Sequence, residues 1–428
     1  RPRDQGSRRA DTAVDERTRA VRLRLAQVAE VRLGRQRAPQ YEHGDHLIPY
    51  LRSANVVDGG LDLTDVKSMN FEPAEQAIFG LSDGDVLMTE GSGSAETVGT
   101  SAVWCGELPG TVCFQNTLLR LRPRSGVTDG RFLAWWARHA HASGQIAAVS
   151  SGANIQHIGS DGLKDLKIHV PDLHEQRRIA DFLDDRVARI DQIIVARLGQ
   201  VDLFSEWISS SVNGLLAPDG VPGRWLRIKD VASKVGSGKT PRGGADAYVE
   251  EGVAFLRSQN VHNDGLRLDD VAFISEDLDE EMSGTRVRGG DVLLNITGGS
   301  LGRCCVADET ALPANVSQHV CIIRPTRIDP SNLALLLRSK VVQDQVRLAQ
   351  VGGNREGLNF EQVRELRFWH PEDPRVWSLC RSREEQGLKG AAIIRSSVSV
   401  LQTYKQSLIT AAVTGEIDVT TAGCGIPG

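Results

Sequence analysis

The segment VGSGKTPRGG, Val235 to Gly244, carries the residue types of a phosphate-binding loop. A P-loop requires G-x-x-x-x-G-K-[ST] with a helix directly after it, so that backbone N–H groups and the helix N-terminus cradle phosphates. Here Ser233 occupies the first glycine position, and Pro241 followed by two glycines prevents a helix of useful length from starting there. We therefore predict that this segment does not bind a nucleotide.

Other patterns that would indicate catalysis are missing from the sequence. There is no Asp/Asn-Pro-Pro-Tyr/Phe motif for amino methylation, no G-x-S-x-G elbow and no convincing nuclease carboxylate cluster. The seven cysteines form no CxxC pair or zinc-like cluster, and the ten histidines are scattered. We expect no catalytic residue, no metal site and no cofactor in this chain, which favours a binding protein.

The composition is that of a soluble globular protein with two or three domains. The chain has 428 residues, of which 40% are hydrophobic and 25% are charged. The net charge of −5 argues against binding nucleic acid through overall positive charge, but it permits local basic faces. With no disulfide pattern, no signal peptide and no membrane span, we expect a cytoplasmic protein without membrane contact. The polar residues 1–20 predict a disordered leader.

The sequence repeats itself at a spacing of roughly 200 residues. YLRSANVVDGGLDL (50–63) returns as FLRSQNVHNDGLRL (255–268), and DGDVLM (83–88) returns as GGDVLL (289–294). Further along, FQNTLLRLRP (114–123) parallels VSQHVCIIRP (316–325). Short alternating apolar runs bounded by Gly, Asp or Asn predict that each copy is a β-rich domain.

A helical period follows each copy. Apolar residues seven apart, with a second seam beside them, predict two long helices that pair as an antiparallel coiled coil. Helices of about 40 residues would each be about 60 Å long. The predicted pairing residues are Leu183, Val187, Ile190, Ile194, Val201, Phe204 and Ile208 in the first helix, and Ile394, Val398, Leu401 and Leu408 in the second.

These patterns predict an α+β chain in which two similar β-rich domains are separated and followed by long helices. The predicted boundaries are a first domain over 21–170, a central helix over 171–216, a second domain over 224–371, a C-terminal helix over 376–416 and a tail over 417–428.

Three segments resemble the specificity subunits of type I restriction-modification systems. VPDLHEQRRIADFLDDRVARID (170–191) resembles the segment that opens their central helix, and LITAAVTGEIDV (408–419) resembles their C-terminal segment. SGKTPRGGADAYVEEGVAFLRSQNV (237–261) resembles the Gly-x-Thr-Pro opening of their target recognition domains. In two places the chain departs from the pattern. Arg375 and Val376 replace the Glu175–Gln176 pair of the first helix, and GRQRAP (34–39) replaces Gly-x-Thr-Pro in the first domain.

The resemblance implies that each domain reads one half of a bipartite double-stranded DNA target and that the helices set the spacing between the halves. It also implies docking of two DNA adenine methyltransferase subunits and of restriction subunits with ATP-dependent translocase and endonuclease activity. S-adenosylmethionine, ATP and Mg²⁺ would then belong to those partners, and this chain would be non-catalytic.

Polar residues on the repeated loops are the candidates for DNA contacts, because Arg and Lys bind phosphate or guanine while Asn and Gln read adenine. They are Arg35, Gln36, Arg37, Gln115, Asn116 and Asn154 in the first domain, and Lys239, Thr240, Arg242, Arg303, Gln318 and Arg355 in the second. Arg52 and Asn55 recur as Arg257 and Asn260, which indicates a shared structural or phosphate-binding role.

Two other functions remain open from the sequence. One is a coiled-coil adaptor whose β-rich domains bind protein or glycan. The other is an enzyme, either a P-loop-like NTPase or a self-sufficient modification enzyme.

Overall fold

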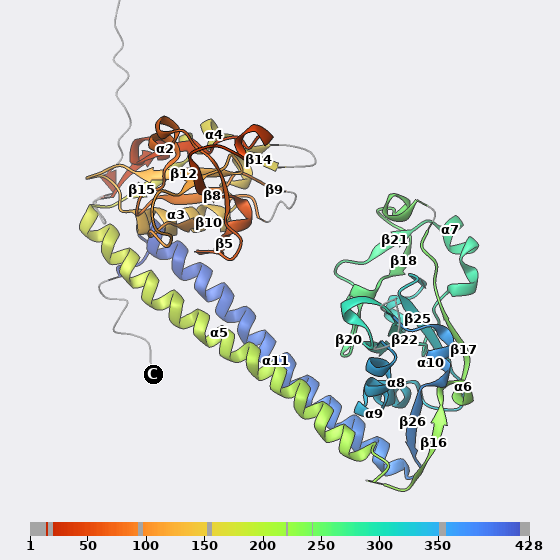
Figure 1. Ribbon diagram of the computed structural model, residues 1–428. Helices are drawn as coiled ribbons and strands as arrows, with labels where there is room; N and C mark the ends of the chain where they lie inside the picture. Colours follow the sequence, from red (N-terminus) through yellow and green to blue (C-terminus); the bar gives the residue numbers. More distant parts are fainter. Residues whose placement is uncertain are drawn as a thin grey trace, which may run out of the picture. The chain divides into compact units, whose positions relative to one another are not determined.

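The computed structural model describes residues 14–15, 20–92, 97–151, 156–219, 221–241, 243–350 and 357–419. The chain divides into two compact units, one comprising Arg1–Val195 with Val398–Gly428 and the other comprising Ala196–Ser397. Each unit contains a globular domain and part of each of two long helices, α5 (Leu173–Leu215) and α11 (Pro374–Thr414) (Figure 1). The first unit therefore combines segments from both ends of the sequence.

The first domain is built on two small sheets. Their strands are β3 (Ala29–Leu33), β4 (Leu47–Leu51), β7 (Lys67–Asn70), β8 (Val86–Thr89), β10 (Ser101–Val103), β11 (Cys113–Phe114) and β12 (Leu118–Pro123). One sheet is antiparallel in the order β10-β8-β12-β3. In the other, β11-β4-β7, β4 pairs with β11 in parallel and with β7 in antiparallel fashion.

Shorter elements complete this domain. They are β1 (Val14–Asp15), β2 (Ala20–Arg24), β5 (Val56–Val57), β6 (Gly60–Leu61), β9 (Gly91–Ser92), β13 (Ser150–Ser151), β14 (Gln156–Ile158) and β15 (Lys167–Val170), with helices α1 (Leu25–Val28), α2 (Pro73–Phe79), α3 (Gly130–Ala142) and α4 (Ser160–Asp165).

The second domain repeats the two main sheets strand by strand. Its main strands are β17 (Ala232–Ser237), β18 (Val253–Leu256), β21 (Ala272–Ile274), β22 (Val292–Asn295), β23 (Cys304–Val306), β24 (Ala314–Val316) and β25 (Val320–Pro325). They form the sheets β17-β25-β22-β23 and β21-β18-β24, with the same neighbours and directions as in the first domain. The other elements are β16 (Gly223–Arg227), β19 (Val261–His262), β20 (Gly265–Leu266), β26 (Arg367–Pro371), α6 (Ile228–Val231), α7 (Glu276–Glu281), α8 (Pro330–Arg338), α9 (Lys340–Leu348) and α10 (Phe360–Glu365).

Central strand β22 shows why the sequence folds in this way. All four of its residues are buried, and successive side chains point to opposite faces of the sheet. Val292 and Leu294 pack into the core beneath α8, whereas Leu293 packs toward β18 and β24. Both faces of the sheet are thus covered, so the first three residues of the strand are apolar. The buried Asn295 at its end donates to the Ser258 carbonyl at 2.8 Å.

The helices pair within each unit. In the first unit, Ile190 and Ile194 of α5 form an apolar cluster with Val398, Leu401 and Leu408 of α11. Lys405 of α11 also contacts Asp191 of α5, with 2.8 Å between Nζ and Oδ1.

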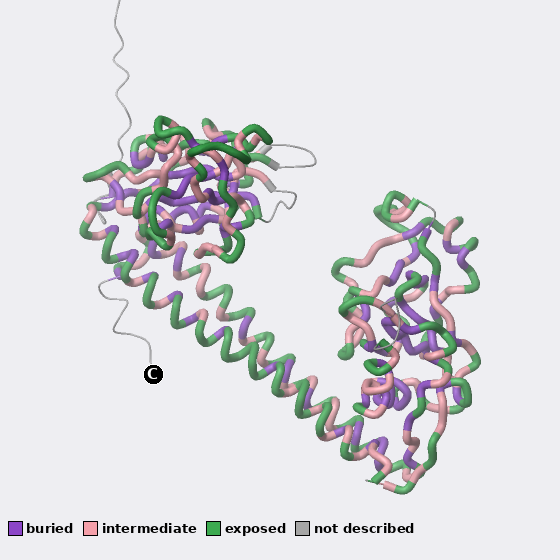
Figure 2. The backbone as a smooth tube through the Cα atoms, in the orientation of Figure 1, coloured by how far each residue is buried: buried purple, intermediate pink, exposed green. Residues whose placement is uncertain are grey.

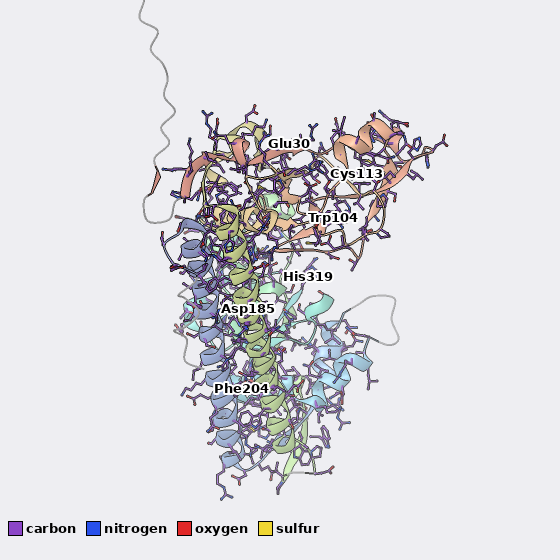
Figure 3. The ribbon with its side chains drawn as sticks, turned by 90° about the vertical axis from the view of Figure 1, so that its left-hand side faces the viewer. Glu30, Trp104, Cys113, Asp185, Phe204 and His319 are labelled. Carbon is purple, nitrogen blue, oxygen red and sulfur yellow. The ribbon has the colours of Figure 1, made fainter. Side chains whose placement is uncertain are left out.

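In the second unit, the later part of α5 meets the earlier part of α11. Gly390 lies against the ring of Phe204, and Gly387 lies against Ile208 (Phe204 is labelled in Figure 3). Arg383 Nη1 donates to the Ser211 carbonyl at 2.9 Å. Because the order of contacts is reversed along the two helices, the pair is antiparallel, and the predicted α+β fold class with its coiled coil is confirmed.

Burial is concentrated in the two domains, while exposed and partly exposed residues prevail along the helices (Figure 2). Val201 is also buried, and Ile394 is partly buried. Two predicted pairing residues have an additional role. Leu183 and Val187 belong to the core of the first domain, which also contains Ile409 and Ala412 of α11. The start of α5 and the end of α11 therefore complete that core.

Several element boundaries differ from the sequence prediction. The helices predicted over 171–216 and 376–416 span Leu173–Leu215 and Pro374–Thr414. Within the predicted disordered leader, Val14–Asp15 form strand β1, because their backbone pairs with Val21 and Ala20 of β2. Residues 1–13 and 16–19 of the leader, and residues 420–428 of the predicted tail, lie outside the described residues.

Candidate nucleic-acid interface

In each domain, the loop that leaves the first strand of the four-stranded sheet crosses closely over a second loop. A Cβ atom at Gly34 would lie 2.1 Å from the Gln115 carbonyl oxygen, and one at Gly238 would lie 1.5 Å from that of Val316. Only glycine fits such an approach. The crossing brings Arg35–Arg37 beside Gln115 and Asn116, and in the second domain it brings Lys239 and Thr240 beside the loop that carries Gln318.

Arg35 is held inside the first domain, contrary to its predicted role at the DNA surface. Its side chain is 8% exposed, and its Nε lies 2.8 Å from Glu75 Oε1. Its Nη1 donates to the Asn70 carbonyl at 2.5 Å, and its guanidinium stacks over the ring of Tyr41. These partners use the N–H donors of Arg35, so the side chain holds the loop onto the domain. We therefore remove Arg35 from the candidate DNA contacts.

The remaining candidates of the first domain lie nearer the surface. Gln36 is exposed, and Gln115 and Asn116 are partly exposed. Arg37 is exposed and pairs with Glu42 at 2.8 Å. An exposed ion pair contributes little free energy, so Arg37 can exchange Glu42 for a phosphate. Asn154 lies outside the described residues.

The second domain presents a polar surface at the corresponding loops. Lys239 and Thr240 are exposed, and among the described residues Lys239 has no ion-pair partner. Gln318 is exposed, and its Nε2 lies 3.2 Å from Nε2 of His319. The Nδ1 atom of His319 is 2.6 Å from Oγ1 of Thr297. His319 (labelled in Figure 3) was missed by the sequence analysis, although it adjoins Gln318 in a repeated block.

Three candidates of the second domain cannot be placed on this surface. Arg303 lines a pocket against α5 and α11, and neither Lys239 nor Gln318 lines that pocket. Its position follows from the turn before β23, which points it toward the helices. Arg242 and Arg355 lie outside the described residues.

The recurring Asn residues fix the loop that supports the crossing loops. Asn260 Nδ2 donates to the carbonyls of Arg267 and Asp270 at 2.9 and 3.2 Å, and its Oδ1 accepts from the Arg257 backbone N–H at 2.9 Å. Asn55 makes the same three contacts in the first domain. Both side chains are 2% exposed, so they have a structural role and do not read bases.

The recurring arginines complete the same motif. Arg52 pairs with Asp65 at 2.5 Å, and Arg257 lies 3.5 Å from Asp270. The strand that precedes each arginine binds the second of the two loops. Leu51 accepts a hydrogen bond from the Gln115 backbone N–H at 2.8 Å, and Leu256 accepts one from the Ser317 backbone N–H at 2.9 Å. The shared role inferred from their recurrence is therefore at least structural.

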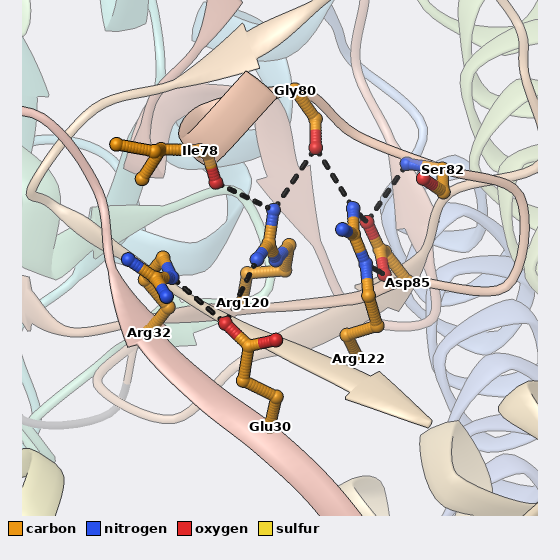
Figure 4. A network of polar contacts seen from close by, with 8 residues as sticks. All are labelled: Glu30, Arg32, Ile78, Gly80, Ser82, Asp85, Arg120 and Arg122. Carbon is orange, nitrogen blue, oxygen red and sulfur yellow. Dashed lines mark hydrogen bonds and ion pairs between the residues drawn. The ribbon is translucent and has the colours of Figure 1, made fainter. Parts of the chain in front are cut away.

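A buried ion pair also recurs in each domain, directly before the central strand β8 or β22. Asp85 is 1% exposed, accepts both Nε and Nη2 of Arg122 at 2.8 and 2.7 Å, and binds the Ser82 backbone N–H (Figure 4). Asp291 and Arg324 repeat this bidentate geometry at 2.7 Å for both contacts. The hydrogen bonds that Arg122 donates to Asp85 raise the pKa of Arg122. These pairs fix the turn before the central strand in both copies.

Arg120 is an addition specific to the first domain. It is 1% exposed and donates to the carbonyls of Ile78 and Gly80 at 3.1 and 3.0 Å, with Glu30 at 3.3 Å (Figure 4). Burial lowers its pKa, but an arginine stays charged. The second domain has Ile322 at this position, so the cores of the two copies differ.

The segment 235–244 does not have the geometry of a P-loop. β17 ends at Ser237, and the next helical element is a short 3-10 turn at Gly244–Ala247. No α-helix begins behind Lys239 to hold a phosphate. This geometry does not support the NTPase alternative.

Within the described part of the chain, no group of three His, Cys, Asp or Glu side chains could hold a metal ion. Burial raises the pKa of Cys113, Cys305 and Cys321 to about 12, so these thiols stay protonated and are poor nucleophiles. Among the same residues, no helix is both long and apolar enough to cross a bilayer.

Comparison with known proteins agrees with this architecture. Residues 23–201 match the family model of the type I restriction modification DNA specificity domain. The type I restriction enzyme EcoKI specificity subunit of Escherichia coli K12 is 26% identical over 281 residues, covering 62% of this chain and 58% of the relative. The StySPI specificity subunit of Salmonella potsdam is 31% identical over 169 residues, covering 39% of this chain and 35% of the relative.

The fold is shared with a solved structure as well. A chain from a study of complex assembly and conformational transition of the type I R-M system has a TM-score of 0.61 and 16% identity, covering 92% of this chain and 98% of that one. The match to EcoKI spans 58% of that relative's length. The chain is thus similar in sequence to type I restriction enzyme specificity subunits, over residues 23–201 to the type I restriction modification DNA specificity domain, and it shares its fold with a chain of a type I R-M system.

Proposed function

We propose that this chain is the DNA-reading subunit of a type I restriction-modification complex, with each domain reading one half of a bipartite duplex target. The observation that carries the proposal is a shared frame with different surface residues. Asn55 and Asn260 make the same contacts in both copies. In contrast, the register of the two sheets places the buried Arg35 and the exposed Gln36 where the second copy has the exposed Lys239 and Thr240. Two domains of one fold with different exposed side chains suit two different half-sites.

The proposed DNA contacts are the exposed or partly exposed residues of the crossing loops. They are Gln36, Arg37, Gln115 and Asn116 in the first domain, and Lys239, Thr240, Gln318 and the added His319 in the second. Cationic side chains there would hold phosphates, and amide side chains would contact base edges in the major groove. The helices would set the length of the unread spacer between the two half-sites.

Catalysis would belong to the partners. Two DNA adenine methyltransferase subunits would bring S-adenosylmethionine, and the restriction subunits would use ATP and Mg²⁺. Exposed apolar residues on α5, namely Leu198, Leu203 and Trp207, support a docking role for the helix, since a helix without a partner seldom leaves so many apolar side chains in water.

A domain exchange tests the reading function. Residues 24–160 are replaced by the matching domain of a relative, and N6-methyladenine is mapped in a host that also expresses the methyltransferase partner. The methylated sequence should change in one half-site only. An unchanged methylation pattern would show that this domain does not read DNA.

Lys239→Ala tests the crossing loop directly. The loss of one phosphate contact should weaken DNA binding and reduce the slope of log K against log salt by about 0.9. Lys167→Ala is the matched control, because Lys167 on β15 is also exposed and has no ion-pair partner among the described residues. Equal effects of the two substitutions would argue against a specific contact by Lys239. Neither substitution should alter affinity for ATP.

A further inference from the structure

A pocket of about 340 Å³ lies within the second unit, between the second domain and the paired helices. The β19–β20 hairpin contributes Asp264 and Arg267, the turn before β23 contributes Arg303, and α8 contributes Arg338. Glu384 and Arg395 of α11 close the opposite side. The apolar side chains of Ile208, Val212 and Leu388 form part of the wall.

The lining carries more cations than anions. Arg267 and Arg395 share the single carboxylate of Asp264, at 2.7 and 3.5 Å. Arg338 pairs with Glu384 in a largely buried contact. Arg303 is exposed and has no ion-pair partner among the residues that the structure describes. Four guanidinium groups and two carboxylates thus line the pocket. The apolar side chains beside them lower the local dielectric constant, which strengthens the positive electrostatic field.

The duplicated fold does not require three of these arginines, namely Arg267, Arg303 and Arg395. The paired segments GLDL (60–63) and GLRL (265–268) align Asp62 with Arg267. The matching positions of the two helices align Val195 with Arg395. The equivalent strands β10 and β23 align Thr100 with Arg303. The first domain reaches the same fold with an acidic, an apolar and a neutral residue at these positions, so these three cations are particular to the second copy.

The hollow continues beyond Arg338. A neighbouring depression shares Ser209, Asn213 and Arg338 with the pocket and adds Lys340 and Arg347, both of which also pair with Asp344. A row of cationic side chains along adjoining hollows suits an extended anion with several phosphate groups better than a single small ion.

We propose that this pocket binds a phosphate group through Arg303, Arg267 and Arg395. Guanidinium groups offer paired N–H donors that match the oxygens of a phosphate. The phosphate could come from the backbone of bound DNA outside the crossing loops, in which case the inference rests on the proposed function. It could also come from free phosphate, which does not depend on that function.

Arg303→Ala tests the pocket, alone and together with Arg395→Ala. Arg327→Ala is the matched control, because Arg327 is exposed in the same domain, lies outside the pocket and has no ion-pair partner among the described residues. In the full chain, inorganic phosphate is titrated against chloride at constant ionic strength and followed by calorimetry. DNA binding is measured in parallel over a range of salt concentrations, with the methyltransferase partner present.

If the phosphate belongs to DNA, Arg303→Ala should lower the salt slope of DNA binding by about 0.9. If it is free phosphate, Arg303→Ala should weaken the affinity for inorganic phosphate by about tenfold or more, while the salt slope of DNA binding stays unchanged. Arg327→Ala should change neither. The proposal is wrong if Arg303→Ala and the double variant match Arg327→Ala in both measurements. Failure of the wild-type chain and its partner to bind DNA would instead refute the proposed function. The phosphate titration would still show whether the pocket binds phosphate.

Discussion

The close contact between α5 and α11 predicts that adding a methyl group at Gly390 lowers the stability of the chain. A Cβ atom at Gly390 would lie 2.5 Å from Cζ and 2.6 Å from Cε1 of Phe204, well inside the roughly 3.5–4.0 Å of an ordinary carbon contact. Gly390→Ala gains roughly 1 kcal/mol of helix propensity. Overpacking against the aromatic ring costs roughly 1–3 kcal/mol. We expect a net loss of stability of up to about 2 kcal/mol.

Gly199→Ala supplies the matched control. Gly199 lies within α5, and a Cβ atom there would meet no atom within 4 Å. This variant should therefore gain the propensity term alone, so the two variants should differ by roughly 1–3 kcal/mol in urea unfolding followed by circular dichroism. Phe204→Leu combined with Gly390→Ala should recover part of the loss. If Gly390→Ala stabilises the chain as much as Gly199→Ala does, the helices do not pack as described.

Two further substitutions test the domains themselves. Asn260→Ala removes three hydrogen bonds from a buried site and should cost about 2–3 kcal/mol in urea unfolding; a loss below about 0.5 kcal/mol would contradict its structural role. His139 is buried and lies 3.1 Å from Thr410 Oγ1 of α11, and burial lowers its pKa. The folded state then binds a proton less readily than the unfolded state, so stability should be full above about pH 6.5 and fall as the pH drops through the lowered pKa. The melting temperature of His139→Gln should fall less between pH 7.5 and 5 than that of the wild type. If the melting temperatures of both proteins fall equally with pH, His139 does not contribute to the pH dependence of stability.

Most of the architecture could be predicted from patterns in the amino-acid sequence. The alternating apolar runs and the seven-residue helical period depend on residues close together in the sequence, and the repeat is visible by comparing two parts of the chain directly. The duplicated β-rich domains and the long helices could therefore be predicted. The two loops of the second domain were also singled out, VGSGKTPRGG for its glycine-rich motif and the block around Gln318 as part of the repeat, but their close crossing was not predicted. Even the rejection of a P-loop needed only Pro241 and its neighbouring glycines.

Long-range contacts decided what individual side chains do. Arg35 and Arg37 are indistinguishable as sequence letters, but Arg35 is buried because Glu75 and the Asn70 carbonyl lie beneath it after folding. Arg303 belongs to a pocket because residues of α5 and α11, distant in the sequence, approach the turn before β23.

The amino-acid sequence thus revealed the repeat, the kinds of secondary structure and the resemblance to type I specificity subunits. The tertiary structure alone decided which arginines remain available to an anion, and it placed the end of α11 in the first domain's core. The physical reason is that hydrophobic periodicity acts between near neighbours, whereas burial and ion pairing depend on groups that only folding brings together.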